Sequence, residues 1–232
     1  GHIPAASPFK AVGRGEEALL LPDPRCCSTA FTKAFNYFEK VDDRVRMAKC
    51  LANLAETYLH VIFTAVAVTG HAPVEILPWL RMTGFAEGLS QEDTPEVAQQ
   101  ALTHFLTVIE NFCTNAITTA SAAFLPVLLM QCQLNFAELR MLQGNPSAAL
   151  TFWLEVKDSY TAAFVVHDQV LLPTKPSQDT IEQHRTVLSR LVRLLFTLDP
   201  VIINANLLLL DTYSNFETYL LSESAASALQ DH

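Results

Sequence analysis

Three features of the 232-residue sequence predict an all-α fold. Apolar residues recur three or four positions apart over long segments, which is the period of an amphipathic helix. Residues that start or stop helices stand at the ends of those segments, as in Thr94-Pro95 and Gly144-Asn145-Pro146. No segment alternates between apolar and polar residues as a half-buried strand does. We therefore expect about seven or eight helices, several of them long.

The first part of the chain divides into a lead-in and two helices. Residues 1–24 contain repeated Pro and Gly and no sustained period, so we expect an extended or partly disordered segment, with room for a short helix at 16–21. A helix is predicted from Ser28 to Lys40. Another is predicted from Asp43 to Thr69, closed by Gly70.

The rest of the chain is predicted to be helical with short interruptions. Prolines and glycines in residues 75–88 favour one or two short helical turns and a loop. Thr94 and Pro95 supply a cap and a first helical residue for the next helix, which should end near Ala116. Later helices are expected to end at Gln143, with Pro126 inside or at the start, and to cover 146–170, 179–198 and 199–222. The helical part, 25–223, is predicted to be a single domain, followed by a frayed tail at 224–232.

Composition limits the possible partners. Half of the residues are apolar, 17% are charged and the formal net charge is -9. Nonspecific nucleic-acid binding needs clustered Lys and Arg, so we expect no nucleic-acid partner. The longest charge-free window, residues 111–137, holds Thr, Asn, Ser and Gln throughout and also Pro126, which favours a buried helix pair over a membrane span.

The five cysteines, Cys26, Cys27, Cys50, Cys113 and Cys132, form no CxxC pair. An odd number suits a reducing compartment, so we predict an intracellular, most simply cytoplasmic, protein. The last three lie on apolar helix faces, where a thiol behaves as a small hydrophobic group. The chain opens with Gly-His-Ile rather than Met, which we interpret as a trimmed end, so a targeting segment can have been removed.

Two stretches carry the pattern of a helical repeat. In QCQLNFAELRMLQGNPSAALTFWLEVKDSY, residues 131–160, small residues at 137 and 149 and an aromatic residue at 153 flank the turn at Gly144. In LANLAETYL the corresponding positions are Leu51, Leu54, Ala55 and Tyr58. This spacing resembles the tetratricopeptide (TPR) repeat, a two-helix unit of about 34 residues. The resemblance covers about a quarter of the chain and is irregular, since Arg140 replaces an aromatic residue and Val156 a small one.

The resemblance implies a right-handed stack of antiparallel helical hairpins, or an irregular helical bundle. In a TPR stack the first helices line a concave groove for a peptide or a partner helix. The matching positions here are Lys49 and Asn53 in one unit and Gln131 and Asn135 in the other. TPR domains that grip a chaperone tail use a set of Lys, Arg and Asn at these positions, and the basic part of that set is incomplete here, so we do not predict chaperone-tail binding.

Two further groups of residues are candidates for partner binding. Phe31, Phe35, Tyr37 and Phe38 are too many large rings for one narrow stripe. Either their helix is buried on several sides, or some of the rings form a partner or dimer surface. Arg190 and Arg193 could share a helix face that receives an acidic partner segment, or that face is simply solvated.

Candidate chemistry is sparse. Glu56 and His60 lie four residues apart on one predicted helix, which gives half of a metal site at most, and a structural pair on the helix face explains them as well. His167 near a helix end has a structural explanation in the helix dipole. No nucleotide-binding or hydrolase motif occurs. We therefore predict no enzyme activity, no cofactor and no metal.

The leading hypothesis is an adaptor or scaffold module that binds a protein partner through a helical groove or an exposed aromatic face, with homo- or hetero-oligomers possible. The partner-binding candidates are Phe31, Phe35, Lys49, Asn53, Asn135, Arg190 and Arg193. The alternative is a helical bundle that encloses a lipid or another hydrophobic ligand. A third and weaker alternative is an enzyme that uses His60 or His167.

Overall fold

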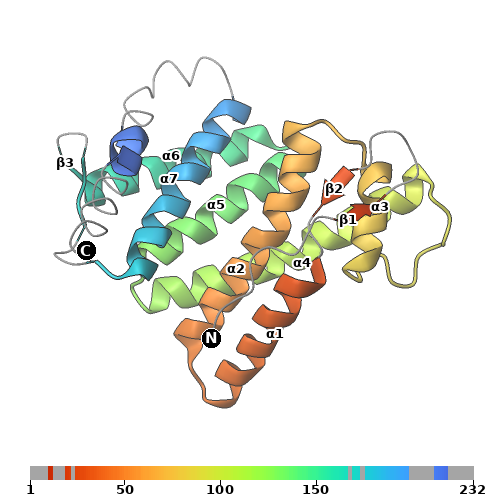
Figure 1. The fold of residues 1–232 in the computed structure, drawn as a ribbon, viewed down its shortest axis with the longest axis horizontal. Helices are drawn as coiled ribbons and strands as arrows, with labels where there is room; N and C mark the ends of the chain where they lie inside the picture. Colours follow the sequence, from red (N-terminus) through yellow and green to blue (C-terminus); the bar gives the residue numbers. More distant parts are fainter. Residues whose placement is uncertain are drawn as a thin grey trace, which may run out of the picture. The chain divides into compact units, whose positions relative to one another are not determined.

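The computed structural model describes residues 10–12, 19–21, 24–166, 169–172, 176–198 and 212–218, with side chains from residue 29 onward (Figure 1). The chain divides into two compact units, Gly1–Asn145 and Pro146–His232. The division falls inside the range 25–223 that the sequence predicts as one domain, at the turn before Pro146.

The described elements are mainly helices, which confirms the all-α fold class. In the first unit they are β1 (Lys10–Val12), β2 (Leu19–Leu21), α1 (Pro24–Lys40), α2 (Arg44–Phe63), the π-helical turn η1 (Thr64–Val68), α3 (Pro73–Met82), α4 (Pro95–Ala122) and α5 (Pro126–Leu142). In the second unit they are α6 (Pro146–Phe164), β3 (Val165–Val166), β4 (Gln169–Val170), α7 (Gln178–Leu198) and a helical segment at residues 212–218.

Local chemistry explains where most helices start and stop. The Asp43 carboxylate accepts a hydrogen bond from the backbone N–H of Arg46 at the start of α2. Thr94 does the same for Val97 at the start of α4, and Pro95 is the first helical residue. Gly70 and Gly144 close their helices with φ of 75° and 72°, the left-handed region that glycine enters without a Cβ clash. These boundaries confirm the signals in the sequence.

Pro126 starts α5 rather than interrupting a helix. The preceding helix, α4, runs to Ala122, past the expected end at Ala116, and Phe124 then turns the chain with φ of 53°. The alternative that placed Pro126 inside a helix is therefore wrong. A proline lacks a backbone N–H, and the first turn of a helix is where that donor is not needed.

Two expectations about helices are corrected by short strands. Leu19–Leu21 pairs antiparallel with Lys10–Val12, where the sequence left room for a helix at 16–21. Helix α6 ends at Phe164 instead of Val170, because Val165–Val166 pairs with Gln169–Val170. A six-residue helix is too short to be stable alone, and β-branched Val165 and Val166 favour extended backbone.

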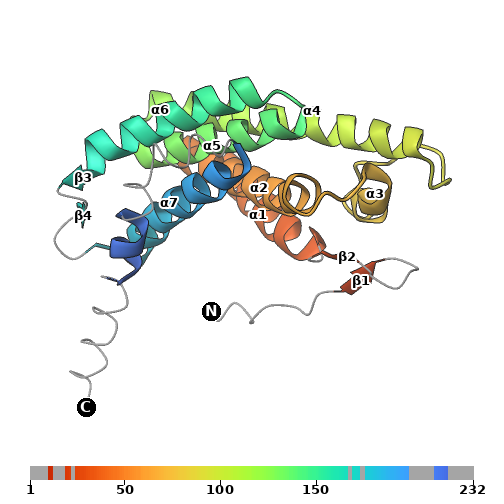
Figure 2. The ribbon, with the colours of Figure 1, turned by 90° about the horizontal axis from the view of Figure 1, so that it is seen from above.

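Helices of the first unit form two layers, with α4 and α5 in one and α1, α2 and α3 in the other (Figure 2). Between the layers, the rings of Tyr58, Trp79, Phe85 and Phe105 meet edge to face, with centroids 5.0 to 6.4 Å apart. Edge-to-face pairs add stabilisation beyond the burial of area. A second core cluster consists mostly of small residues, which let helices approach closely; its members are Ala48, Ala52, Ala116, Ala120, Leu128 and Cys132.

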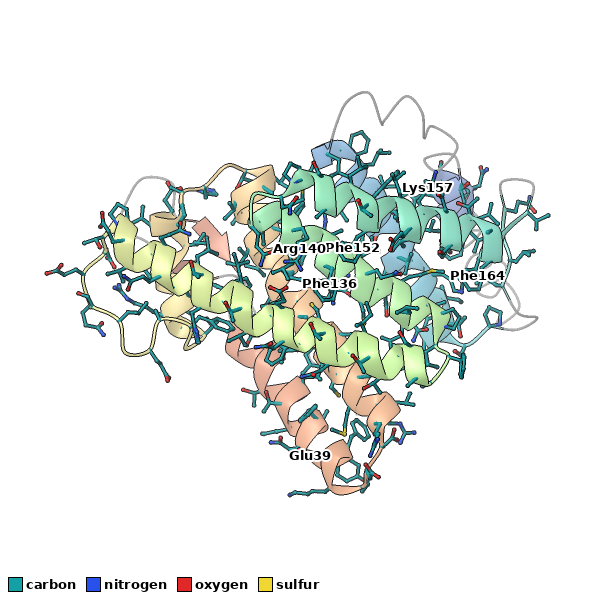
Figure 3. All side chains as sticks on the ribbon, turned by 180° about the vertical axis from the view of Figure 1, so that it is seen from behind. Glu39, Phe136, Arg140, Phe152, Lys157 and Phe164 are labelled. Atoms are coloured by element: carbon teal, nitrogen blue, oxygen red, sulfur yellow. The ribbon has the colours of Figure 1, made fainter. Side chains whose placement is uncertain are left out.

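Charged side chains also join α4 to α5. Arg140 donates a hydrogen bond to Glu110 at 2.9 Å. Its guanidinium lies 5.8 Å from the ring centroid of Phe136, one turn earlier on α5 (Figure 3). Both partners of the ion pair are partly exposed, so the pair orients α5 on α4 more than it stabilises the fold.

Helix α2 with η1, Arg44–Val68, is long and apolar enough to cross a membrane by length and composition. Half of its most apolar window is buried inside the protein. It packs against α1, α4 and α5, as the core helix of a globular domain does. The helix therefore has a protein environment for its apolar face.

In the second unit, three polar contacts connect helices that are distant in sequence. The indole Nε1–H of Trp153 on α6 donates to the carbonyl of Leu191 on α7 at 2.8 Å. The Tyr160 hydroxyl lies 2.8 Å from Nδ1 of His184, and both side chains are buried. Arg185 forms a two-pronged ion pair with Glu217, which holds residues 212–218 against α7 and lowers the pKa of the Glu217 carboxyl.

The buried His184 makes the stability of the second unit dependent on pH. Burial lowers its pKa below the usual value near 6.5, and its ring faces Tyr160 and Phe164. As pH falls below about 6.5, the unfolded chain binds a proton before the folded chain does, so we expect this stability to be present above that pH and lost below it. The loss is at most about 1.4 kcal/mol per pH unit for one proton.

Urea unfolding at several pH values between about 7.5 and 5 measures the pH dependence of this stability. Unfolding of the second unit is followed by the fluorescence of Trp153 in a Trp79→Phe background. The substitution His184→Gln keeps a hydrogen-bonding side chain that does not titrate, and should flatten the pH dependence. An unchanged slope in the His184→Gln variant would show that other groups cause it.

Candidate interaction groove

A groove of about 360 Å³ lies between α1 and α2 in the first unit. Its described lining consists of Phe31 from α1 and, from α2, Asn53, Glu56, Thr57, His60 and Val61. The floor is therefore mixed, with an aromatic ring and a valine beside an amide, a carboxylate, a hydroxyl and an imidazole. Such a mixture of apolar and hydrogen-bonding groups is typical of sites that recognise a specific ligand.

The periodicity of α2 explains why these side chains face the groove. Residues three and four apart share a helix face, so Asn53, Glu56 and His60 form one stripe. The opposite face of α2 is buried and contains Leu54, Tyr58 and Ile62. Core packing on that side leaves the polar stripe on the accessible side, so α2 presents the same residues whenever the unit is folded.

Helix α1 supplies the aromatic wall. It packs mainly on α2, and none of its rings Phe31, Phe35, Tyr37 and Phe38 is fully buried. Tyr37 is 61% exposed, and the Arg46 guanidinium lies 5.4 Å from the ring centroid of Phe38. The interpretation in which α1 is buried on several sides is therefore wrong. The half-exposed rings fit the other interpretation, a surface available to a partner.

Lys49 and Asn53, expected to line a groove, both lie along the outer face of α2. Asn53 is exposed and lines the groove, and Lys49 is half-buried one turn before it. No described residue forms an ion pair with Lys49. The structure thus brings together Phe31 and Asn53, which the sequence indicates separately, whereas Lys49 lies outside the described groove lining. The groove lining also includes Thr57 and Val61, which the sequence prediction missed. Their spacing of four from Asn53 and from each other indicates a common helix face and could have identified them.

Three other predicted partner-binding residues do not lie on an accessible surface like that of the α1–α2 groove. Asn135 is buried in α5 and donates its amide to the carbonyl of Ala52 at 3.2 Å. Arg190 is 3% exposed, and Arg193 is half-buried. The predicted basic outer face of α7 and the predicted groove position of Asn135 are therefore wrong. Helical spacing places residues on a common face but does not say whether another helix covers that face.

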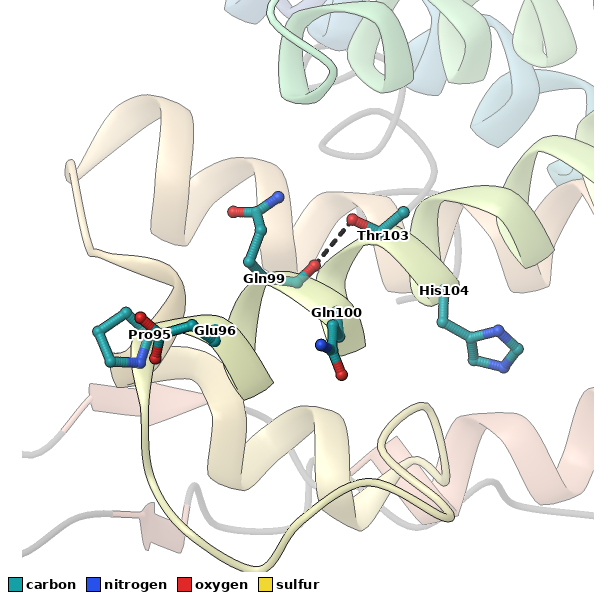
Figure 4. A pocket seen from close by; sticks show the side chains of 6 residues that line it. All are labelled: Pro95, Glu96, Gln99, Gln100, Thr103 and His104. Atoms are coloured by element: carbon teal, nitrogen blue, oxygen red, sulfur yellow. Dashed lines mark hydrogen bonds between the residues drawn. The ribbon is translucent and has the colours of Figure 1, made fainter.

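A second hollow, larger and shallower, follows the first turns of α4. Its described lining is Pro95, Glu96, Gln99, Gln100, Thr103 and His104, and its volume is about 760 Å³. Gln99 and Thr103 point to one side of the helix, whereas Gln100 and His104 point to another (Figure 4). Side chains that diverge in this way cannot converge on one ligand group, so the α1–α2 groove is the better candidate.

Histidine and cysteine chemistry is limited in the described part of the chain. No group of three or more His, Cys, Asp or Glu side chains there could hold a metal ion. Cys50, Cys113 and Cys132 are buried, as expected for small hydrophobic groups, and burial raises the pKa of the Cys50 thiol. His60 lines the groove, while His167 and the side chains of Cys26 and Cys27 lie outside the described residues.

Comparison with known proteins gives no relative from which a role could be transferred. The chain matches no protein-family model, no curated protein and no solved structure.

Proposed function

We propose that the protein is an interaction module that binds a segment of a partner protein in the α1–α2 groove. The observation that carries the proposal is the groove itself, where the half-exposed Phe31 faces the amide, carboxylate and imidazole stripe of α2. An aromatic ring gives apolar contact area, and Asn53 can both donate to and accept from a partner backbone. The TPR-like spacing in the sequence suggests the same kind of role.

The size of the groove favours a narrow occupant. A volume of about 360 Å³ is at the lower end of the range for ligand sites. A helix with its side chains is about 10–12 Å across and would fill this volume with less than one turn, so it could place no more than single side chains in the groove. An extended segment of a few residues fits, and it would satisfy backbone groups with the Asn53 amide and the Thr57 hydroxyl.

A photocrosslinking experiment tests the proposal. A benzoylphenylalanine replaces Phe31 in one variant and Leu154, an exposed residue on α6, in a matched control. Both are irradiated in an extract of the source cells, and crosslinked segments are mapped by mass spectrometry. We expect a defined partner segment at position 31 that the control does not capture.

The captured segment is then synthesised, and its Kd is measured by calorimetry. We expect Asn53→Ala to weaken binding about tenfold, since a lost hydrogen-bonded amide in a partly desolvated groove is worth roughly 1.4 kcal/mol. Asn111→Ala, an exposed Asn on α4, should leave the Kd unchanged. Equal crosslinking at both positions contradicts the proposal, and a lipid crosslinked at position 31 would favour a hydrophobic-ligand site.

A further inference from the structure

The turn between α4 and α5 presents an aromatic ring to solvent. Phe124 stands in this turn and is 90% exposed, more than any other large hydrophobic residue that the structure describes. Its backbone φ is 53°, in the left-handed region. Among the other described residues that are not glycine, Asp42 alone has a positive φ, and a short polar side chain tolerates it. A large ring in this conformation is strained.

The end of α5 shows which residue this conformation normally takes. The backbone N–H of Phe124 donates to the carbonyl of Ser121 at 3.2 Å, and the next N–H donates to a carbonyl five residues before it at 3.1 Å. Gly144 has the same place at the end of α5, where the corresponding bonds measure 3.0 and 2.8 Å. Glycine caps a helix in this way without a Cβ clash. The end of α4 thus combines a strained backbone with an exposed ring where glycine would avoid both, and such retained strain points to a function.

The start of α2 lies beside this turn. Tyr58, far along α2, meets Phe105 in the first half of α4, with ring centroids 6.4 Å apart. Ala48, near the start of α2, shares a core cluster with Ala120 near the end of α4, and Leu125 packs against that cluster. The two helices therefore run antiparallel, and α2 begins where α4 ends (Figure 3).

The surroundings of the ring are uncharged along the chain and basic across it. Residues 111–137 carry no charge. On α2, Arg44 lies four residues before Ala48 on the same helix face, which places it next to the turn. Its side chain is 78% exposed, and its ion pair with Asp42 at 3.4 Å is of the surface kind that contributes little in water. The guanidinium can therefore exchange this carboxylate for another anion.

The charge balance at this end differs from that of the whole chain. Residues 33–49 contain five basic and three acidic residues, a local balance of +2, whereas the formal net charge of the chain is -9. Salt screens charges beyond about 8 Å at physiological ionic strength. A surface that touches the turn is therefore attracted by the local positive balance more than it is repelled by the distant acidic residues.

We propose that the α4–α5 turn docks on an anionic lipid membrane, with the Phe124 ring among the headgroups and Arg44 beside the lipid phosphates. A fluid lipid layer accepts one protruding ring without a pocket shaped for it, and aromatic rings favour the membrane–water interface. A protein partner would need a closely complementary hollow. One ring with a few cations gives weak and reversible binding. This inference goes beyond the proposed function and does not depend on the α1–α2 groove.

Cosedimentation of the full chain with phosphatidylcholine vesicles, with and without phosphatidylserine, tests the inference. We expect binding to the phosphatidylserine vesicles that weakens as salt is added. Phe124→Gly should weaken binding at least about tenfold, because the buried area of the ring is lost. Glycine also relieves the strained φ, so this variant should unfold at the same or a higher urea concentration than the original protein. Val68→Ala, at a residue that is 52% exposed at the opposite end of α2 and η1, is the matched control and should bind normally.

The contribution of charge is measured separately. Arg44→Gln should weaken binding about fivefold, the usual effect of one basic residue near an anionic surface. Gln99→Glu makes the same change in net charge at an exposed position in the first half of α4, and should not weaken binding. Asn53→Ala in the α1–α2 groove should also leave vesicle binding unchanged, so failure of this inference and failure of the proposed function are distinguishable.

Insertion of the ring is observed with Phe124→Trp. The two native Trp side chains are buried, so brominated lipids should quench the new indole and leave the native ones bright. The same probe at Val68→Trp should not be quenched. Benzoylphenylalanine at position 124, irradiated with vesicles in a cell extract, should give lipid adducts.

Four outcomes overturn the inference. They are equal binding to the two kinds of vesicle or to neither, unchanged binding by Phe124→Gly, equal quenching at positions 124 and 68, and protein adducts without lipid adducts at position 124. The last outcome would make the turn an anchor for a protein partner.

Discussion

Replacement of Trp153 by Ala should destabilise the second unit by about 3–5 kcal/mol, the largest loss of stability that we expect from a single substitution in this protein. The Trp153 side chain is fully buried, and its indole N–H donates to the carbonyl of Leu191 on α7. The substitution leaves a large cavity and removes this contact between α6 and α7. A typical domain stability of about 5–15 kcal/mol leaves little margin for such a loss.

Hydrogen exchange separates this effect from a change in the first unit. Backbone amides of α6 and α7 should lose protection in Trp153→Ala, whereas those of α2 and α4 should keep theirs. Trp153→Phe preserves an aromatic ring without the donor and should cost less than the Ala variant. Phe196→Ala, at a ring that is 60% exposed on α7, is the matched control and should change little. Equal losses of amide protection in Trp153→Ala, Trp153→Phe and Phe196→Ala would contradict the role that we assign to the buried indole of Trp153.

Substitution of Asn135 by Asp should destabilise the first unit by at least about 3 kcal/mol at neutral pH. Asn135 is fully buried and donates its amide to the carbonyl of Ala52, so it joins α5 to α2. A carboxylate of the same shape cannot donate when ionised, and it would place a charge against a carbonyl oxygen inside the protein. The cost should shrink at low pH, where the carboxyl is protonated and can donate again.

Urea unfolding followed by Trp79 fluorescence in a Trp153→Phe background measures this change, because the sequence has two Trp residues and Trp79 lies in the first unit. Asn111→Asp on the exposed side of α4 is the control for the change of charge. If both Asp variants have similar free energies of unfolding, the interior position of Asn135 is wrong. The same result would restore the sequence prediction that Asn135 is an accessible, partner-binding residue.

The candidate site can be predicted from the sequence in part. Spacing or excess aromatic character points to Phe31, Lys49 and Asn53, and the structure places Phe31 and Asn53 in the lining of the α1–α2 groove, with Lys49 one turn before Asn53 and outside the lining. The sequence also shows Glu56 and His60 as a pair on one face of a helix, but there the pair is explained as a structural one, with half of a metal site at most as the alternative, and not as the wall of a groove. The difference arises because the sequence does not show that α1 places the ring of Phe31 in the same groove as the pair.

Arg190 shows why the other candidates failed. Its spacing from Arg193 predicts a common helix face, and the inward positions Val187, Leu188 and Leu191 are buried as expected. Yet Arg190 is buried too, because it lies three residues from Val187 and four from Leu194, at the edge of the same buried face of α7. A basic residue in a sequence is normally assigned to solvent, and the assignment is overruled only when its neighbours in space are known.

Local chemistry determined the helices from the sequence alone. Helix caps, prolines at first helical positions and left-handed glycines act on backbone atoms within a few residues of themselves, so short stretches of sequence predict their effect. The examples here are Thr94, Pro95, Pro126 and Gly144. Tertiary structure decided which polar residues are buried and which line the groove. Asn135 and Ala52 are 83 positions apart, and packing brings them together, because burial is a property of the surfaces that meet rather than of the residues one by one.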